Sequence, residues 1–109
     1  MKPGKRNKRN QIGEPFVPVL KRMINSPAYK RLTNASRVAY LLLKAQCNEN
    51  GQCEVKFPYR DAQLYMKSNT FSKSIKQLEA LGFIEKTQHG GLFRCTNVYR
   101  LIDKWREVK

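Results

Sequence analysis

The pattern of apolar residues changes at Gly82, and this change constrains the fold more than any other feature of the sequence. Before Gly82, apolar residues recur every three or four positions, most clearly in NASRVAYLLLKAQC (34–47). This spacing predicts amphipathic helices. After Gly82, the segments FIEKT and NVYRLI have strand-like alternation, and the glycine pair 90–91 between them permits the positive φ angles of a hairpin. The chain is therefore predicted to be mainly α with a small β-hairpin, an α+β fold.

Two short helices are predicted ahead of the long one. The first begins at Pro18, and its apolar residues recur at spacings of three and four: Phe16, Val19, Leu20, Met23 and Ile24. Ser26 is a typical N-cap for the second, with Pro27 at its first position. Thr33 is predicted to cap the long helix. The buried stripe of that helix is expected at Ala35, Val38, Ala39, Leu42 and Ala45, widened by Leu41 and Leu43.

The segment between the long helix and Gly82 predicts a strand and two helices. CEVKF alternates as a brief strand does. Pro58 begins a second helix, 58–66, whose expected packing residues are Ala62, Leu64, Tyr65 and Met66. A polar turn, 67–69, leads to a third helix at about 70–81, with Phe71, Ile75, Leu78 and Leu81 facing inward. Near the other end of the sequence, Trp105 is expected to cover an edge of the core.

The chain is strongly basic. It holds 22 Lys and Arg against 8 Asp and Glu, a formal net charge of +14. Residues 1–13 carry five of the cations, no acid and little to bury, so residues 1–14 are predicted to be a flexible basic arm and 15–109 the folded domain. The remaining 17 basic and 8 acidic residues still give +9. An excess of this size favours a polyanionic partner.

Two segments resemble winged helix-turn-helix DNA-binding domains of the bacterial, phage and plasmid regulator and replication-protein type. KSNTFSKSIKQLEALGFIEKTQHGG (67–91) has the polar helix start and the L-x-x-L-G-F-I run into the wing, and SPAYKRLTNASRVAYLLLKAQCNENG (26–51) has the lead-in S-P-A-[YW]-x-x-L-[TS]. The similarity spans about 16–101. The sequence departs from the pattern at Pro58, where a Ser or Thr cap is common, and at Tyr65-Met66-Lys67, where small apolar residues are common. The resemblance implies a winged helix-turn-helix fold and binding to double-stranded DNA.

A recognition helix at about 69–81 is expected to make the sequence-reading contacts. Its outward residues are polar or basic: Ser68, Asn69, Thr70, Ser72, Lys73, Lys76 and Gln77. Asn and Gln amides can read adenine edges, Ser and Thr can meet bases or phosphates, and lysines supply positive charge. The alternative is that these residues form an ordinary solvated helix face. The absence of acid beside Lys73 and Lys76 favours the DNA interpretation.

Three further groups are expected to contact the DNA backbone. Lys56, Tyr59 and Arg60 could form a clamp at the start of the second helix, although Tyr59 could equally pack in the core. In the wing, Lys86, His89 and Arg94 flank the glycine pair and could lie along the backbone or enter the minor groove. The arm could follow phosphates or a minor groove, or act only as a solubilising tail; its DNA-binding candidates are Lys5, Arg6, Lys8 and Arg9.

Catalysis, metal binding and a membrane location are not expected. No nucleophile–base pair, phosphate-binding glycine loop or paired-carboxylate motif occurs, so the chain is predicted not to be an enzyme and to need no cofactor or small-molecule substrate. The spacing of Cys47, Cys53, His89 and Cys95 fits no usual zinc pattern. Three cysteines without a CxxC pair, no signal-peptide core and no long apolar run predict reduced cysteines in a cytoplasmic, nucleoid-associated protein.

These observations leave several functions open. The leading hypothesis is a transcriptional regulator of a bacterial or mobile genetic element. The first alternative is a plasmid or phage replication or partition accessory protein, which would use the same surface. The second alternative is a protein-interaction module, which should show exposed apolar anchors. RNA binding is less favoured because no aromatic stacking stripe is evident. The lead-in segment or the Trp105 region could support a homodimer, which would suit two half-sites on DNA.

Overall fold

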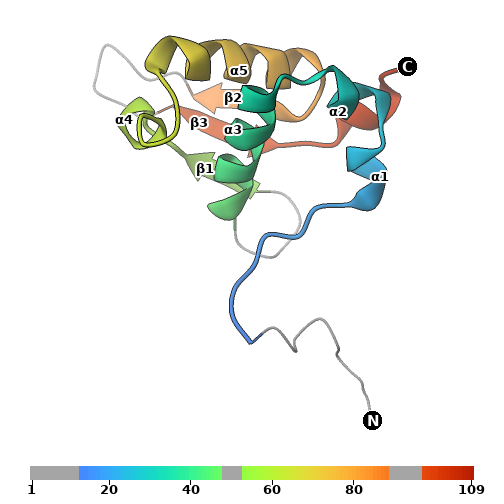
Figure 1. Cartoon of the computed structure of the whole chain (residues 1–109), viewed down its shortest axis with the longest axis horizontal. Coiled ribbons are helices and arrows are strands. Elements are labelled where there is room, and N and C mark those ends of the chain that lie inside the picture. Colours follow the sequence, from blue (N-terminus) through green and yellow to red (C-terminus); the bar gives the residue numbers. More distant parts are fainter. Residues whose placement is uncertain (1–12, 48–52, 89–96) are drawn as a thin grey trace.

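The computed structural model describes residues 13–47, 53–88 and 97–109 (Figure 1). Within these ranges the order of elements agrees with the predicted order of helices and strands, and the α+β class is confirmed. The helices are α1 (Lys21–Ile24), α2 (Pro27–Arg31), α3 (Asn34–Ala45), α4 (Tyr59–Ala62), α5 (Ser68–Ala80) and the 3-10 helix η2 (Lys104–Glu107). The strands are β1 (Cys53–Lys56), β2 (Ile84–Gln88) and β3 (Val98–Leu101).

The strands form one antiparallel sheet in the order β1-β3-β2, so the last strand of the sequence is the central one. Glu54 and Glu85 both lie opposite Arg100, whose guanidinium donates to the Glu54 carboxylate at 2.8 Å and lies 3.6 Å from that of Glu85. This ion-paired group occupies the exposed side of the sheet. Val55 and Tyr99, paired one position further along, are buried on the other side.

The long helix α3 buries only part of the predicted stripe, namely Ala39 and Leu43. Its cap is as expected, since the Thr33 hydroxyl accepts a hydrogen bond from the Ser36 N–H at 3.1 Å. Its buried residues, however, are Ser36, Ala39, Tyr40 and Leu43, whereas Val38 is 40% exposed and Ala45 is also exposed. The prediction was wrong at Val38, Leu41 and Ala45, because it left Ser36 and Tyr40 out of the inward face. A buried hydroxyl with hydrogen-bond partners is compatible with a core position.

The segment before α3 contributes less to the core than its spacing predicts. Helix α1 begins at Lys21 rather than Pro18, and Met23 is its buried residue. Phe16, Leu20 and Ile24 are 48%, 55% and 44% exposed. The next helix is as predicted, with Pro27 at its start and the Ser26 hydroxyl accepting from the Tyr29 N–H at 3.2 Å.

The second predicted helix is much shorter in the structure. Helix α4 ends at Ala62, and the N–H groups of Tyr65 and Met66 both donate to the Ala62 carbonyl in the turn that follows. The expectation that Leu64 and Tyr65 pack inward is wrong: they are 82% and 60% exposed, whereas Met66 is partly buried against the core. Three consecutive large side chains in a turn cannot all face the same core, because successive residues point in different directions.

Helix α5 begins at Ser68, slightly earlier than predicted, and its inward residues Phe71, Ile75 and Leu78 are buried as expected. Gly82 follows its end with a φ of 87°, a conformation that L side chains rarely adopt. A Cβ at Gly82 would lie 2.7 Å from the backbone N of Trp105, so glycine also allows the carboxy-terminal segment to approach closely. Trp105 is 4% exposed and stacks on Phe83 with ring centroids 6.2 Å apart, which confirms its predicted place at the core.

Cys47 and Cys53 form a disulfide that joins the residues after α3 to the start of β1, with Cα atoms 5.6 Å apart. This corrects the expectation of reduced cysteines. Sequence spacing could not reveal the pair, because a disulfide depends on the distance between two Cα atoms after the chain reverses direction. Cys95 lies outside the described residues. Among the described helices, none combines the length and apolar character that a membrane span requires.

Candidate nucleic-acid interface

Helix α5 presents a polar, basic stripe opposite its buried face. Asn69, Lys73 and Lys76 are exposed and lie at positions i, i+4 and i+7, so their side chains emerge on one side of the helix. We call these three residues the α5 stripe. Ser72 and Thr70 flank the stripe and are partly exposed. The first acid in the helix is Glu79, one turn beyond Lys76, so the stripe itself holds two positive charges and no acid.

The acidic residues that form ion pairs lie elsewhere. Among the described residues, the salt bridges use Arg60, Arg100 and Arg106 as cations, and none uses Lys73 or Lys76. Arg100 is engaged on the exposed sheet face, and Arg106 pairs with Asp103 at 3.3 Å near the carboxy-terminal end. The α5 stripe therefore keeps its charge available for an external anion.

Gln77 belongs to the packing of the domain rather than to the α5 stripe. Its Oε1 accepts from the Thr33 N–H at 3.0 Å and from the Ser36 hydroxyl at 2.6 Å. Its Nε2 donates to the Arg31 carbonyl at 3.2 Å. The side-chain amide thus joins α5 to the junction between α2 and α3. The sequence places Gln77 on a recognition face, but its hydrogen bonds in the structure leave it no free donor–acceptor pair for an adenine edge, so we omit it from the interface.

The residues expected at the start of the second helix have mixed environments. Tyr59 is partly buried, and its ring meets that of Phe71 edge-on with centroids 5.1 Å apart, as the packing alternative requires. Lys56 is exposed at the end of β1. The Arg60 side chain is 86% exposed, and its distance of 3.9 Å from Asp61 makes only a weak ion pair. The Tyr59–Phe71 contact places these two cations beside α5.

The other residues predicted to contact DNA either make contacts within the domain or lie outside the described residues. The Ser68 hydroxyl accepts from the Gln63 side-chain amide at 3.0 Å. Lys86 is partly buried on β2, opposite Tyr99. The remaining expectations lie outside the described residues, namely the arm residues Lys5, Arg6, Lys8 and Arg9 and the loop residues His89 and Arg94.

The turn between α4 and α5 forms a surface that was not predicted from the sequence. Leu64 and Tyr65 project from it, next to the exposed Lys67. The available signal was the run Leu64-Tyr65-Met66 itself. A run of three large residues without helical or strand spacing leaves at least one of them outside the core.

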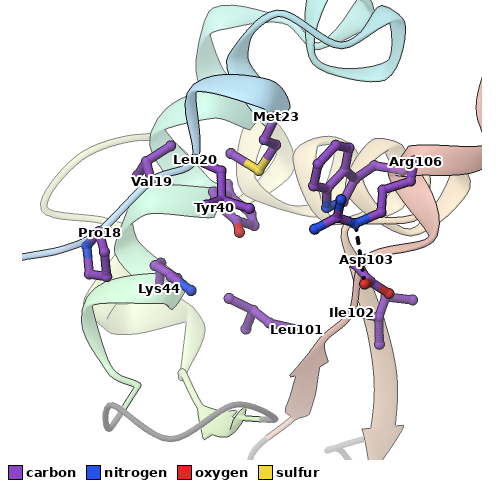
Figure 2. Close-up of a pocket in the computed structure, with 11 residues that line it drawn as sticks. Pro18, Val19, Leu20, Met23, Tyr40, Lys44, Leu101, Ile102, Asp103 and Arg106 are labelled. Atoms are coloured by element: carbon purple, nitrogen blue, oxygen red, sulfur yellow. Dashed lines mark ion pairs between the residues drawn. The ribbon is translucent and has the colours of Figure 1, made fainter.

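A separate pocket of about 360 Å³ lies between the amino-terminal segment, α3 and the carboxy-terminal segment (Figure 2). The Tyr40 hydroxyl and the Lys44 ammonium point into it, and Leu101 lies across from them. Burial, with a smaller contribution from nearby Tyr29, raises the pKa of Tyr40 to about 12. Met23 of α1 lines the pocket, and α1 lies on the opposite side of the domain from α4 (Figure 1). Its walls contain no described group of three or more His, Cys, Asp or Glu that could hold a metal ion.

Comparisons with known proteins give a likeness of fold. No protein-family model matches the sequence, and no curated protein matches it. A solved structure described as an MDR initiator superposes with a TM-score of 0.58 at 18% identity, over 89% of this chain and 84% of that one. The N-terminal domain of a DNA-binding protein superposes with a TM-score of 0.59 at 22% identity, over 94% of this chain and 85% of that one. A structure described as a Rep–DNA complex superposes with a TM-score of 0.58 at 22% identity, over 94% of this chain and 86% of that one. The chain therefore shares the fold of an initiator and of DNA-binding proteins across most of its length.

Proposed function

We propose that this chain is a winged helix-turn-helix domain that binds double-stranded DNA through α5. The observation that carries the proposal is the α5 stripe: two lysines and an asparagine, exposed on one side of a helix, with no acid among them and no ion pair to either lysine among the described residues. The shared fold with the protein of a Rep–DNA complex supports it. In this proposal α5 is the recognition helix, and the hairpin of β2 and β3 is the wing.

In this proposal the exposed polar and basic residues make different contacts with the DNA. The major groove is about 12 Å wide and admits an α-helix, so α5 can bring Asn69 to an adenine edge. Lys73 and Lys76 would neutralise phosphates or reach base acceptors. Arg60 and Lys56 would hold the backbone beside the groove. The wing residues His89 and Arg94 and the basic arm stay predictions for additional backbone contacts.

A role in DNA replication is favoured over transcriptional regulation. Two of the structures with this fold are described as an initiator and as a Rep–DNA complex. The domain would act by binding alone, with no catalytic step. A homodimer on paired half-sites, supported by the α1 segment or by the Trp105 region, stays a prediction and is measurable by sedimentation with and without DNA.

The test is a fluorescence-polarisation titration of the full chain with a random duplex of about 25 base pairs at several salt concentrations. Each phosphate neutralised by the protein should contribute about 0.9 to the log–log salt slope. The variant Lys73→Ala/Lys76→Ala should bind more weakly, with a slope reduced by about 1.8 if both lysines contact phosphates. The matched control is Lys30→Ala/Lys44→Ala, which removes the same charge from α2 and α3.

The two double variants separate a specific interface from general charge. Greater weakening by the α5 variant than by its control supports the proposal. Equal weakening by both variants would mean that DNA binding depends on the overall charge and not on a particular surface. If only the deletion of residues 1–14 weakened binding, α5 would not contact the DNA. Failure of the full chain to bind at low salt would overturn DNA binding altogether. If the full chain does bind, selection of preferred duplexes from a random pool would distinguish recognition of base sequence from binding to the backbone alone.

A further inference from the structure

The turn between α4 and α5 exposes two adjacent large side chains. Leu64 is 82% exposed, the highest value for a large hydrophobic residue in the described part of the chain, and Tyr65 is 60% exposed. A single exposed apolar residue is common and needs no explanation. Leu64 and Tyr65, however, line one surface hollow together with Lys67, directly before the proposed recognition helix, so both can reach the same ligand.

Hydrogen bonds and one partly buried neighbour hold this turn in place. The N–H groups of Tyr65 and Met66 donate to the Ala62 carbonyl at 2.9 and 3.0 Å. The Gln63 amide closes the turn by donating to the Ser68 hydroxyl at 3.0 Å. Met66 packs against the core. Since the backbone is fixed in this way, Leu64 and Tyr65 are held outward, and a ligand that contacts them would pay little of the entropy of ordering a loop.

The surroundings of the pair are basic. Arg60 precedes it with a side chain 86% exposed, and Lys67 follows it and is exposed. Asp61, the nearby acid, pairs with Arg60. An apolar pair framed by cations complements a polyanion that has apolar groups at its edge. A second group of exposed apolar residues belongs to the amino-terminal segment around α1, which lies on the opposite side of the domain from α4 (Figure 1).

We propose that Leu64 and Tyr65 contact the 5-methyl groups of thymines in the major groove. This inference rests on the proposed function. In helix-turn-helix docking, the first residues of the recognition helix meet base edges, so the turn just before it lies at the groove. Thymine is the base that presents a methyl group there, and apolar side chains recognise it by contact. Leu64 and Tyr65 would therefore add a preference for thymine at the end of the site next to the adenine read by Asn69.

The experiment replaces each thymine of a selected, preferred duplex by deoxyuridine, one position at a time. This change removes the methyl group and leaves the Watson–Crick pair intact. At one or two positions the wild-type chain should bind about fourfold more weakly, the factor expected for about 0.8 kcal/mol of lost apolar contact. Leu64→Ala or Tyr65→Ala should lower this ratio towards one. The control, Leu20→Ala, removes a 55% exposed leucine from the α1 side and should keep the wild-type ratio.

The ratio of affinities for thymine and uracil duplexes is insensitive to changes in folding or self-association, because these affect both duplexes alike. A wild-type ratio near one at every position overturns the inference and leaves DNA binding intact. Equal losses on both duplexes from Leu64→Ala also overturn it, because the pair would then contact sugars rather than methyl groups. Unchanged DNA binding by both turn variants overturns it as well and would assign the pair to a protein partner. Absence of DNA binding by the wild type would instead refute the proposed function.

Discussion

Replacement of Gln77 by leucine should destabilise the domain by about 2–4 kcal/mol. The change keeps the size of the side chain and removes all three hydrogen bonds of the amide. The Ser36 hydroxyl is fully buried, and the loss of its acceptor should cost about 1–3 kcal/mol. The Thr33 N–H and the Arg31 carbonyl lie nearer the surface, where water can replace the amide, so each should contribute only about 0.5 kcal/mol.

Urea unfolding followed by the fluorescence of Trp105, the single tryptophan of the chain, measures this loss directly. With a typical slope for a small domain, the midpoint should fall by about 1–2 M. Ser36→Ala added to Gln77→Leu should recover about 1 kcal/mol, because it removes the hydroxyl that has lost its acceptor. The matched control is Gln63→Leu, which loses one exposed hydrogen bond and should change stability by less than about 0.5 kcal/mol.

An unchanged midpoint for Gln77→Leu would refute this reasoning. A second outcome would restore the role expected from the sequence: if the variant kept wild-type stability but bound adenine-containing duplexes more weakly, Gln77 would be a base-reading residue. The structural role predicts the reverse, with weaker DNA binding only in conditions where the domain is partly unfolded.

Two further predictions concern the disulfide and the buried tyrosines. Cys47→Ser/Cys53→Ser should lower stability by about 2 kcal/mol, the chain-entropy estimate for so short a loop, and a reductant should lower the urea midpoint of the wild type but not of the variant. Burial is the main cause that raises the pKa values of Tyr40 and Tyr99 to about 12 from the usual 10. Their contribution to stability should be complete below pH 10 and should decline as pH rises from 10 to 12, because the unfolded chain then loses these protons first. Thermal melts across this range, with tyrosinate absorbance recorded in parallel, would contradict this if stability stayed constant while both residues ionised.

Much of the fold could be predicted because local sequence patterns and tertiary structure agree. Phe71, Ile75 and Leu78 have helical spacing and form the buried face of α5. Thr33 and Ser26 cap helices as their side-chain chemistry predicts, and Gly82 occurs where a positive φ is needed. In each case the determining interaction lies within a few residues along the chain.

The errors arose where the environment of a residue depends on the three-dimensional course of the chain rather than on the local spacing of apolar residues. Ser36 is buried because Gln77, 41 positions away, provides an acceptor for its hydroxyl. The Cys47–Cys53 bond depends on how the chain returns from α3 to the sheet. Leu64 is exposed because helix α4 ends at Ala62. For the candidate site, the lysines of α5 followed from helical spacing, whereas the packing role of Gln77 and the exposed turn required the tertiary structure.

The strand order has a consequence for how the protein is made. Because β3 lies between β1 and β2, neither earlier strand has a partner in this sheet until Val98–Leu101 has left the ribosome. The pairing of Cys53 with Leu101 closes a long stretch of chain, and such non-local contacts slow folding. The helices can form during synthesis, but the sheet and the Trp105 contact must wait until residues 98–105 have emerged. During that interval β1 and β2 expose unpaired edges, and this is the period in which a nascent chain would be most prone to aggregate.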